Sequence, residues 1–318
     1  GAMSSWIAAA TSYSTSDTPM IPFYIYYSMF GFQRVGDLAW ASGDMRARGF
    51  LLGGTAGRTT LNGEGLQHED GHSHVMSATI PNCVSYDPTF SYEVAVIIAD
   101  GLRRMYAEQD DVFYYITVMN ENYQHPAMPD GVEDGIVKGM YLFREGSAGK
   151  KSAPRVQLLG SGTILREVIA AADLLEQDWN VAADVWSAPS FTELGREGMA
   201  TERWNMLHPA DERRQSFVEA QLSGRPDGPA IAATDYVRAF ADQIRPYVNR
   251  RYRVLGTDGF GRSDYRRKLR EHFEVNRHFI TLAALTELAA EGSVPAGAAA
   301  EAIKKYGLNP NKPDPARA

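Results

Sequence analysis

The stretch from Arg155 to Ser187, RVQLLGSGTILREVIAAADLLEQDWNVAADVWS, decides the fold class. It opens with a short apolar run, Arg155 to Leu159, which the turn Gly160-Ser161-Gly162 joins to a helical pattern at Ile164 to Gln177. A second apolar run follows at Ala183 to Ser187. Two strands joined by a helix form a βαβ unit, in which the strands are parallel and the crossover is right-handed. The sequence therefore predicts an α/β fold.

The same alternation continues on both sides of this unit. Further strands are expected at 20–29, 82–86, 113–119, 231–234 and 252–255. Helices are expected at 35–48, 91–106, 237–246, 275–291 and 295–306. Between the two halves, Asn120 to Asp130 carries two prolines, and Glu145 to Ala153 has the composition of a linker. We therefore expect two domains, at residues 1–128 and 129–318.

Composition narrows the class of protein. The net charge of −7 argues against a nucleic-acid partner, because phosphate contacts need clustered lysines and arginines. The chain lacks an apolar stretch of 18 residues, so we expect no membrane span. Cys83 is the only cysteine, which excludes an intrachain disulfide and fits a reducing, cytoplasmic setting.

The densest polar cluster is the loop Asn62 to His74, NGEGLQHEDGHSH. Its glycines disfavour a continuous helix, so several imidazoles and carboxylates can converge on one point. One interpretation is proton transfer or substrate contact in a cofactor enzyme, since histidine exchanges protons near neutral pH. A second is a metal site made by His68, His72 and His74, although this spacing lacks the helical HExxH form. A third is a polar loop that satisfies its own backbone.

Two other features attract attention. The run Tyr24 to Arg34, YIYYSMFGFQR, lies at the end of a predicted strand. Its aromatic side chains could stack on a planar ligand, and Arg34 could contact the polar edge of that ligand. The alternative is that these aromatic side chains pack in the core. The glycine-rich turns at Gly160 to Gly162 and Gly256 to Gly261 follow strands, but their spacing is a weak phosphate-binding signal. We interpret both as tight turns between a strand and a helix.

The loop and the aromatic run also carry a family resemblance. GRTTLNGEGLQHEDGHSH (57–74) and YYSMFGFQRVGDLAWASGDMRARGFLLGG (26–54) closely resemble the homodimeric bacterial pyruvate dehydrogenase decarboxylating component, a transketolase-like enzyme. The similarity continues in order through IPNCVSYDP (80–88), YYITVMNENY (114–123), VQLLGSGTILREV (156–168), SFTELGREG (190–198), ERWNMLHP (202–209) and VLGTDGFGRSD (254–264). The motif EDGxxH, Glu69 to His74, also resembles a motif of the wider transketolase group.

The resemblance implies a fold and a set of site residues. Residues 1–128 resemble the later part of the domain that holds the pyrimidine of thiamine diphosphate, and residues 129–318 resemble a transketolase-type C-terminal α/β domain. The residues that match positions around the cofactor pyrimidine are Tyr27, Phe30 and Arg34. Those that match the reacting centre and the EDGxxH pattern are Glu64, His68, Asp70 and His74.

The resemblance also implies a reaction and partners. Thiamine diphosphate, held with Mg²⁺, supplies the carbanion chemistry that decarboxylates pyruvate, and the protein supplies orientation and proton control. The acetyl group passes to a lipoyl group on the dihydrolipoamide acyltransferase component. We expect a homodimer, and we expect His68 to donate or position a proton at the substrate oxygen or the lipoyl sulfur.

Two elements of the family pattern lie outside this sequence. The activating glutamate should precede Ser4, and the GDG motif that anchors magnesium and diphosphate does not occur. We therefore expect a C-terminal fragment that binds no thiamine diphosphate and is inactive by itself. A dimerisation or scaffold module and a histidine-rich metal-dependent hydrolase are the alternatives.

Overall fold

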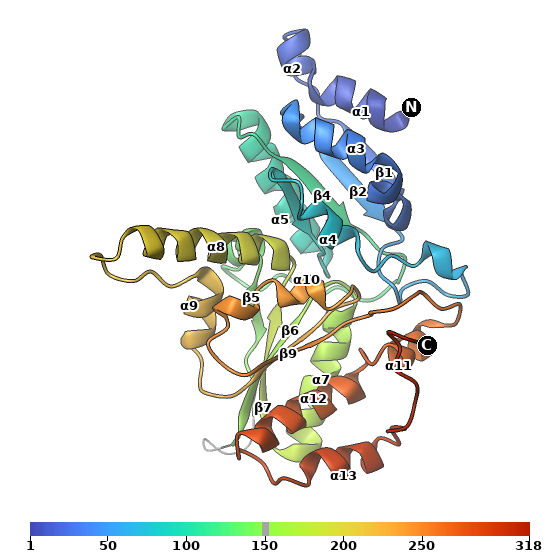
Figure 1. Ribbon diagram of the computed structural model, residues 1–318, viewed down its shortest axis with the longest axis vertical. Helices are drawn as coiled ribbons and strands as arrows, with labels where there is room; N and C mark the ends of the chain where they lie inside the picture. Colours follow the sequence, from blue (N-terminus) through green and yellow to red (C-terminus); the bar gives the residue numbers. More distant parts are fainter. Residues whose placement is uncertain (148–152) are drawn as a thin grey trace.

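The computed structural model describes residues 1–147 and 153–318 and contains two α/β domains, one above the other in Figure 1. The first is built on a four-stranded sheet in the order β1-β2-β4-β3, with all strands parallel. Its strands are β1 (Phe23–Tyr27), β2 (Phe50–Gly54), β3 (Cys83–Tyr86) and β4 (Phe113–Thr117).

Helices cover both faces of this first sheet. Leu51, Phe113 and Tyr115 point to one face, where they pack on α1 (Ala2–Ala10) and α3 (Gly31–Asp44). Their neighbours in the strands, such as Phe50, Tyr114 and Ile116, point to the other face and meet α5 (Ser91–Leu102) and α6 (Glu133–Lys138). Because helices cover both faces, every residue of β3 and β4 is buried, whereas the edge strand β1 alternates between exposed and partly buried residues.

The second domain has a five-stranded sheet in the order β5-β7-β6-β8-β9. Its strands are β5 (Tyr141–Arg144), β6 (Arg155–Gly160), β7 (Ala182–Ser187), β8 (Ala230–Ala233) and β9 (Tyr252–Leu255). Among the strands that the structure describes in this sheet, β5 alone runs antiparallel to its neighbour. The central pair β6 and β7 is joined by α7 (Ile164–Trp179), the βαβ unit that the sequence predicts.

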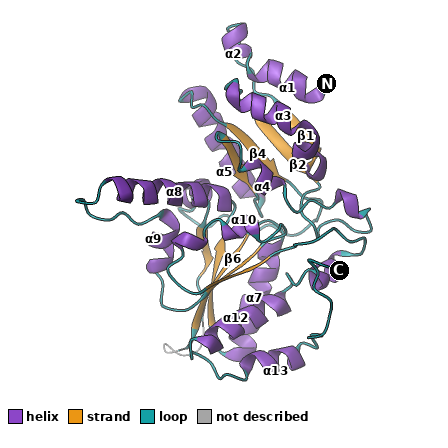
Figure 2. Cartoon of the chain, in the orientation of Figure 1, coloured by secondary structure: helices purple, strands orange, loops and turns teal. Residues whose placement is uncertain are grey.

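Alternation along the strands again produces two cores. Leu158, Val185 and Ile231 face a layer made of α7, α12 (Arg277–Ala290) and α13 (Ala298–Lys305). Leu159 and Trp186 face the opposite layer. This layer consists of α8 (Phe191–Leu207), α9 (Phe217–Ser223) and α10 (Ala239–Asp242). Figure 2 shows the strands of this sheet enclosed by helices.

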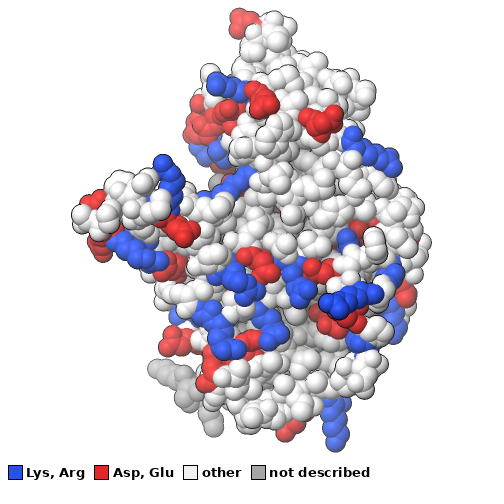
Figure 3. All heavy atoms as spheres, in the orientation of Figure 1, with Lys and Arg blue, Asp and Glu red and all other residues white. Residues whose placement is uncertain are grey.

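Short elements complete the fold. They are α2 (Ser12–Thr15), α4 (Ser73–Ser77), α11 (Arg266–His272), the 3₁₀ turns Ser28–Phe30, Leu66–His68 and Arg245–Tyr247, and a π-helical turn Arg103–Ala107 after α5. Among the described residues, none of the helices has the length and apolar character needed to cross a bilayer. On the face seen in Figure 3, acidic and basic side chains are interspersed over the second domain.

The predicted α/β fold class is confirmed, but several elements differ from the prediction. Strand β2, which ends in Gly53 and Gly54, is absent from the expected strands. The helix expected at 237–246 stops at Asp242 and gives way to a 3₁₀ turn. Pro246 explains the break, because it has no N–H to donate to the carbonyl of Asp242. The predicted linker Glu145–Ala153 lies partly outside the described residues.

Candidate functional site

The site lies where two neighbouring parallel strands end. Tyr27 is the last residue of β1 and pairs in register with Gly54, the last residue of β2. The chain then turns through Ser28–Phe30 directly into α3. Ligands of open α/β sheets bind at the carboxyl ends of the strands, so Tyr27 and Phe30 stand at the edge where a site is expected.

Three rings form an aromatic cluster at this edge. The ring of His68 lies 5.6 Å from that of Tyr27 and 5.3 Å from that of Phe30, the latter at 89°. Tyr27 and Phe30 are 6.1 Å apart, and the guanidinium of Arg34 sits 4.3 Å from the centroid of Phe30. The structure thus brings together side chains from β1, α3 and the Asn62–His74 loop.

Glu64 orients His68 within this cluster. The Nδ1 of His68 lies 3.0 Å from Oε2 of Glu64, and both side chains remain partly open to solvent. A carboxylate only accepts, so Nδ1 carries the hydrogen and the other ring nitrogen, Nε2, is left to exchange a proton. The pair therefore has the arrangement of an acid–base group whose tautomer is set by a carboxylate.

Asp70 and His74, also predicted as catalytic, take buried positions. The carboxylate of Asp70 accepts hydrogen bonds from the backbone N–H groups of His72 and Ser73 and from the Ser73 hydroxyl, so it holds the start of α4. Hydrogen bonds from N–H groups two and three residues further on are those of an Asx turn. The catalytic role of Asp70 stays a prediction, whereas its part in shaping the loop follows from these bonds.

His74 points into the junction between the two domains. Its ring nitrogens lie 2.7 Å from Ser85 Oγ and 3.0 Å from Thr117 Oγ1, and the ring stacks on Phe240 at 4.7 Å. Burial lowers the pKa of His74 to about 3, so the imidazole is neutral at pH 7. Its contacts join β3 and β4 to α10, and its catalytic role likewise stays a prediction.

The three histidines proposed as metal ligands diverge. His68 faces Glu64 and the aromatic cluster, His72 lies 2.8 Å from Gln33 Nε2, and His74 is bonded in the interior. Within residues 1–147 and 153–318, no group of three or more such side chains is close enough to hold a metal ion. The geometry gives no support to the hydrolase alternative.

Glu69 is a member of the loop whose importance only the structure reveals. Its Oε2 accepts a hydrogen bond from the backbone N–H of Arg262 at 2.7 Å, which ties the loop to the second domain. Burial raises the pKa of Glu69 to about 8. Because Arg262 lies almost two hundred residues further along the chain, no local pattern could have revealed this contact.

The difference in free energy of unfolding between the wild type and Glu69→Gln is expected to depend on pH. The folded-state pKa of Glu69 lies above its unfolded value, so its favourable contribution is complete below the unfolded pKa and is lost as the pH rises through about 8. Glu69→Gln mimics the protonated acid. It should therefore gain at least about 1 kcal/mol over the wild type between pH 5 and pH 8.5. Urea denaturation at both pH values checks this, and a difference independent of pH would contradict it.

Two further buried carboxylates join the domains. Asp87 accepts from Ser161 Oγ at 2.7 Å and from Thr117 Oγ1 at 2.8 Å, and burial raises its pKa to about 7. The turn Gly160 to Gly162 is therefore a contact between domains and not a phosphate loop. Asp235 accepts from the backbone N–H of Thr59 at 3.1 Å, and burial raises its pKa to about 6.

Comparisons with known proteins agree with this architecture. Residues 1–126 match the family described as pyruvate dehydrogenase E1 component middle domain, and residues 139–276 match the transketolase-like C-terminal domain. Transketolase from Leishmania mexicana superposes with a TM-score of 0.62 at 16% identity, over 87% of this chain and 36% of that one. A chain described as split gene transketolase, inactive beta4 tetramer, gives 0.62 at 14% identity, over 89% and 81%. The fold is therefore that of a transketolase-like α/β protein.

Curated relatives show to which transketolase-like proteins this chain is closely similar in sequence. The pyruvate dehydrogenase E1 component of Cupriavidus necator is 70% identical over 315 residues, and that of Escherichia coli K12 is 60% identical over 319 residues. Over nearly its whole length the chain is homologous to pyruvate dehydrogenase E1 components. Each alignment covers 99% of this chain but 35% of the relative, so the chain spans about a third of the length of the curated relatives it matches. The domain boundary at 128 stays a prediction and falls between the two matched ranges.

Proposed function

We propose that this chain supplies the pyrimidine-binding and proton-transfer side of the active site in a thiamine-diphosphate-dependent pyruvate dehydrogenase. The observation that carries the proposal is the aromatic cluster, which converges with Arg34 and the Glu64–His68 pair at the ends of β1 and β2. This cluster joins a surface for a planar ring to an acid–base group in one place. The names of the relatives support the substrate, pyruvate.

The exposed rings fit one face of a flat heterocycle. Tyr27 is 44% exposed although it is large and aromatic, and it lies beside Phe30 on a strand end that faces outward. A cofactor ring stacked here would cover apolar surface that is otherwise left in water. Arg34 contributes hydrogen-bond donors at the polar edge of the same surface.

The residues of the site then have different roles in the proposed reaction. Bound thiamine diphosphate, with Mg²⁺, supplies the electron sink for loss of carbon dioxide from pyruvate. Tyr27 and Phe30 orient the ring, Glu64 holds the imidazole of His68, and Nε2 of His68 delivers a proton at the substrate oxygen or at the lipoyl sulfur of the dihydrolipoamide acyltransferase component. We place this activity in a homodimer and, from the lone and buried Cys83, in the cytoplasm.

Two titrations test the cofactor role. The 318-residue chain should give no measurable binding of thiamine diphosphate with Mg²⁺, because the GDG motif that holds magnesium and diphosphate in the family pattern does not occur in it. In an enzyme where these residues are joined to the remaining polypeptide of the relatives, Tyr27→Ala combined with Phe30→Ala should weaken cofactor binding by about tenfold or more. Phe260→Ala is the control, since this exposed phenylalanine lies outside the cluster.

Two results would contradict the cofactor role. Micromolar binding by the isolated chain would show that it contains a complete site. Unchanged affinity in the Tyr27 and Phe30 double variant, or an equal loss in Phe260→Ala, would show that the rings do not hold the cofactor.

One observation favours an assembly role beside the catalytic one. Strand β1 lies at the edge of its sheet, and its outward side chains Phe23 and Ile25 are exposed, as are Met20 and Ile21 before it. A contiguous apolar edge of this kind marks an association surface. Sedimentation velocity of the purified chain separates the two roles, because a stable dimer without activity would support the scaffold reading.

A further inference from the structure

A cavity of about 540 Å³ lies mainly on the second domain, and none of the residues that line it belongs to the aromatic cluster. Its walls come from α7, from α11, from the start of α12 and from Glu121, which follows β4. This volume falls within the roughly 300–1,000 Å³ of small-molecule sites. The proposed function uses none of the residues that line it.

Positive charge dominates the cavity. Five arginines line it against two glutamates, Glu121 and Glu167, so the lining carries three more positive than negative charges. The arginines are Arg166, Arg266, Arg267, Arg270 and Arg277. His278, which completes the lining, has its pKa lowered by burial and by the Arg277 charge, and adds no negative charge. Such an excess in a concave site attracts anions.

The two carboxylates are shared among several cations. Glu121 contacts Arg166 at 2.6 Å, lies 3.7 Å from Arg266 and also pairs with Arg270. Glu167 accepts two hydrogen bonds, each 3.0 Å long, from the guanidinium of Arg277. These pairs hold the arginine side chains in place, so the cavity is organised before any ligand arrives.

Arg267 is the cation that this arrangement leaves free. Within the described part of the chain it forms no ion pair, and its one side-chain hydrogen bond goes to Tyr265 Oη at 3.4 Å. A planar guanidinium without a carboxylate presents its donors to whatever enters the cavity.

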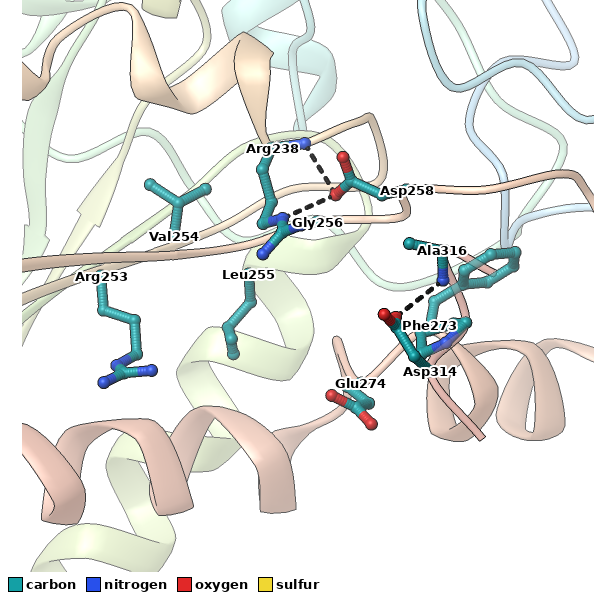
Figure 4. Close-up of a pocket in the computed structure, with 11 residues that line it drawn as sticks. Arg238, Arg253, Val254, Leu255, Gly256, Asp258, Phe273, Glu274, Asp314 and Ala316 are labelled. Atoms are coloured by element: carbon teal, nitrogen blue, oxygen red, sulfur yellow. Dashed lines mark hydrogen bonds and ion pairs between the residues drawn. The ribbon is translucent and has the colours of Figure 1, made fainter. Parts of the chain in front are cut away.

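A neighbouring cavity provides the contrast. Figure 4 shows this smaller space of about 190 Å³, where Arg238 donates to Asp258 and where Asp314 accepts from the backbone N–H of Ala316. Its two arginines face three carboxylates, those of Asp258, Glu274 and Asp314. The smaller cavity therefore has no excess of positive charge, in contrast to the larger one.

We propose that the larger cavity binds a phosphorylated small molecule through its phosphate or diphosphate group. Fork-shaped guanidinium groups match phosphate oxygens two at a time, which lysines or backbone N–H groups alone do not. The volume leaves room beside the phosphate for an organic group. The ligand of this cavity is distinct from the cofactor of the proposed active site.

Calorimetric titration of the 318-residue chain with sodium pyrophosphate at low salt tests the proposal. The wild type should show saturable binding with a dissociation constant below about 1 mM. Arg267→Gln combined with Arg166→Gln should weaken it by about tenfold or more, because each change removes a bidentate partner. Arg213→Gln is the matched control, as Arg213 is 65% exposed and pairs with Glu219 outside the cavity.

Three outcomes would overturn the proposal: no saturable heat from the wild type up to about 10 mM pyrophosphate, unchanged affinity in the double variant, or an equal loss in Arg213→Gln. Sodium chloride at matched ionic strength must not reproduce the signal. If loss of Arg166 perturbs folding, as circular dichroism would show, Arg267→Gln alone decides, because it breaks no ion pair of the described residues.

Discussion

Replacing His68 by alanine, in an enzyme that contains this chain together with the rest of the polypeptide, is expected to lower kcat by about 100-fold or more. The imidazole lies beside Tyr27 and Phe30 with Nδ1 held 3.0 Å from Glu64, so Nε2 is the free proton-transfer atom of the site. Alanine keeps the loop backbone but removes the proton carrier. Stopped-time assays of pyruvate turnover measure the loss.

His72→Ala is the matched control for this substitution. His72 belongs to the same loop but contacts Gln33 rather than the aromatic cluster, so its removal should change kcat by less than about threefold. Glu64→Gln should lower kcat by a smaller factor than His68→Ala and move the pH profile, because the amide can no longer stabilise a charged imidazole. Unchanged turnover in His68→Ala would exclude the acid–base role.

Replacing Gly53 by alanine is expected to reduce the free energy of unfolding by about 3 kcal/mol, since overpacking and the loss of a buried hydrogen bond add together. A Cβ at Gly53 would overlap the hydroxyl oxygen of Tyr115 and lie 3.0 Å from Cβ of Ser28. The Tyr115 hydroxyl donates to Ser73 Oγ at 2.9 Å, and Ser73 in turn donates to Asp70. The substitution should therefore also loosen the loop that carries Glu64 and His68.

Gly54→Ala provides the comparison at the next position of the same strand. Its Cβ would meet the backbone oxygen of Tyr26 at 3.4 Å, an ordinary contact, so the expected change is within about 0.5 kcal/mol. Urea denaturation followed by near-ultraviolet circular dichroism measures both. Equal stability of the two variants would show that the Tyr115 hydroxyl yields without cost.

The central strand β2 illustrates where prediction from sequence reached its limit. Its residues Phe50 to Gly54 contain two glycines, which favour turns and weaken strands. The structure shows that Gly53 is required because a tyrosine from the neighbouring strand passes over it. That neighbour is Tyr115, more than sixty residues away, and a local pattern cannot record such a contact.

The segments that form the candidate site could be predicted from the sequence, but residue patterns alone do not show which of their residues meet in space. The aromatic run and the polar loop were each visible in the sequence, and the structure places Tyr27, Phe30, Arg34, Glu64 and His68 together. The resemblance, and not the spacing of residues, separated these five from the other polar residues of the loop. His68 ends the turn Leu66–His68, in which no residue is buried, whereas His74 lies in α4 and is buried.

The sequence alone determined that strands alternate with helices, because apolar periodicity records which face of each element is buried. It also determined which segments carry the aromatic rings and the histidines. Tertiary structure alone decided that Asp70 and His74 enter the interior while His68 stays at the surface, and that Glu69 binds the second domain at Arg262. It likewise gathered five arginines from three helices around two glutamates. The physical reason is that burial and charge pairing depend on distances in space, which chain separation does not encode.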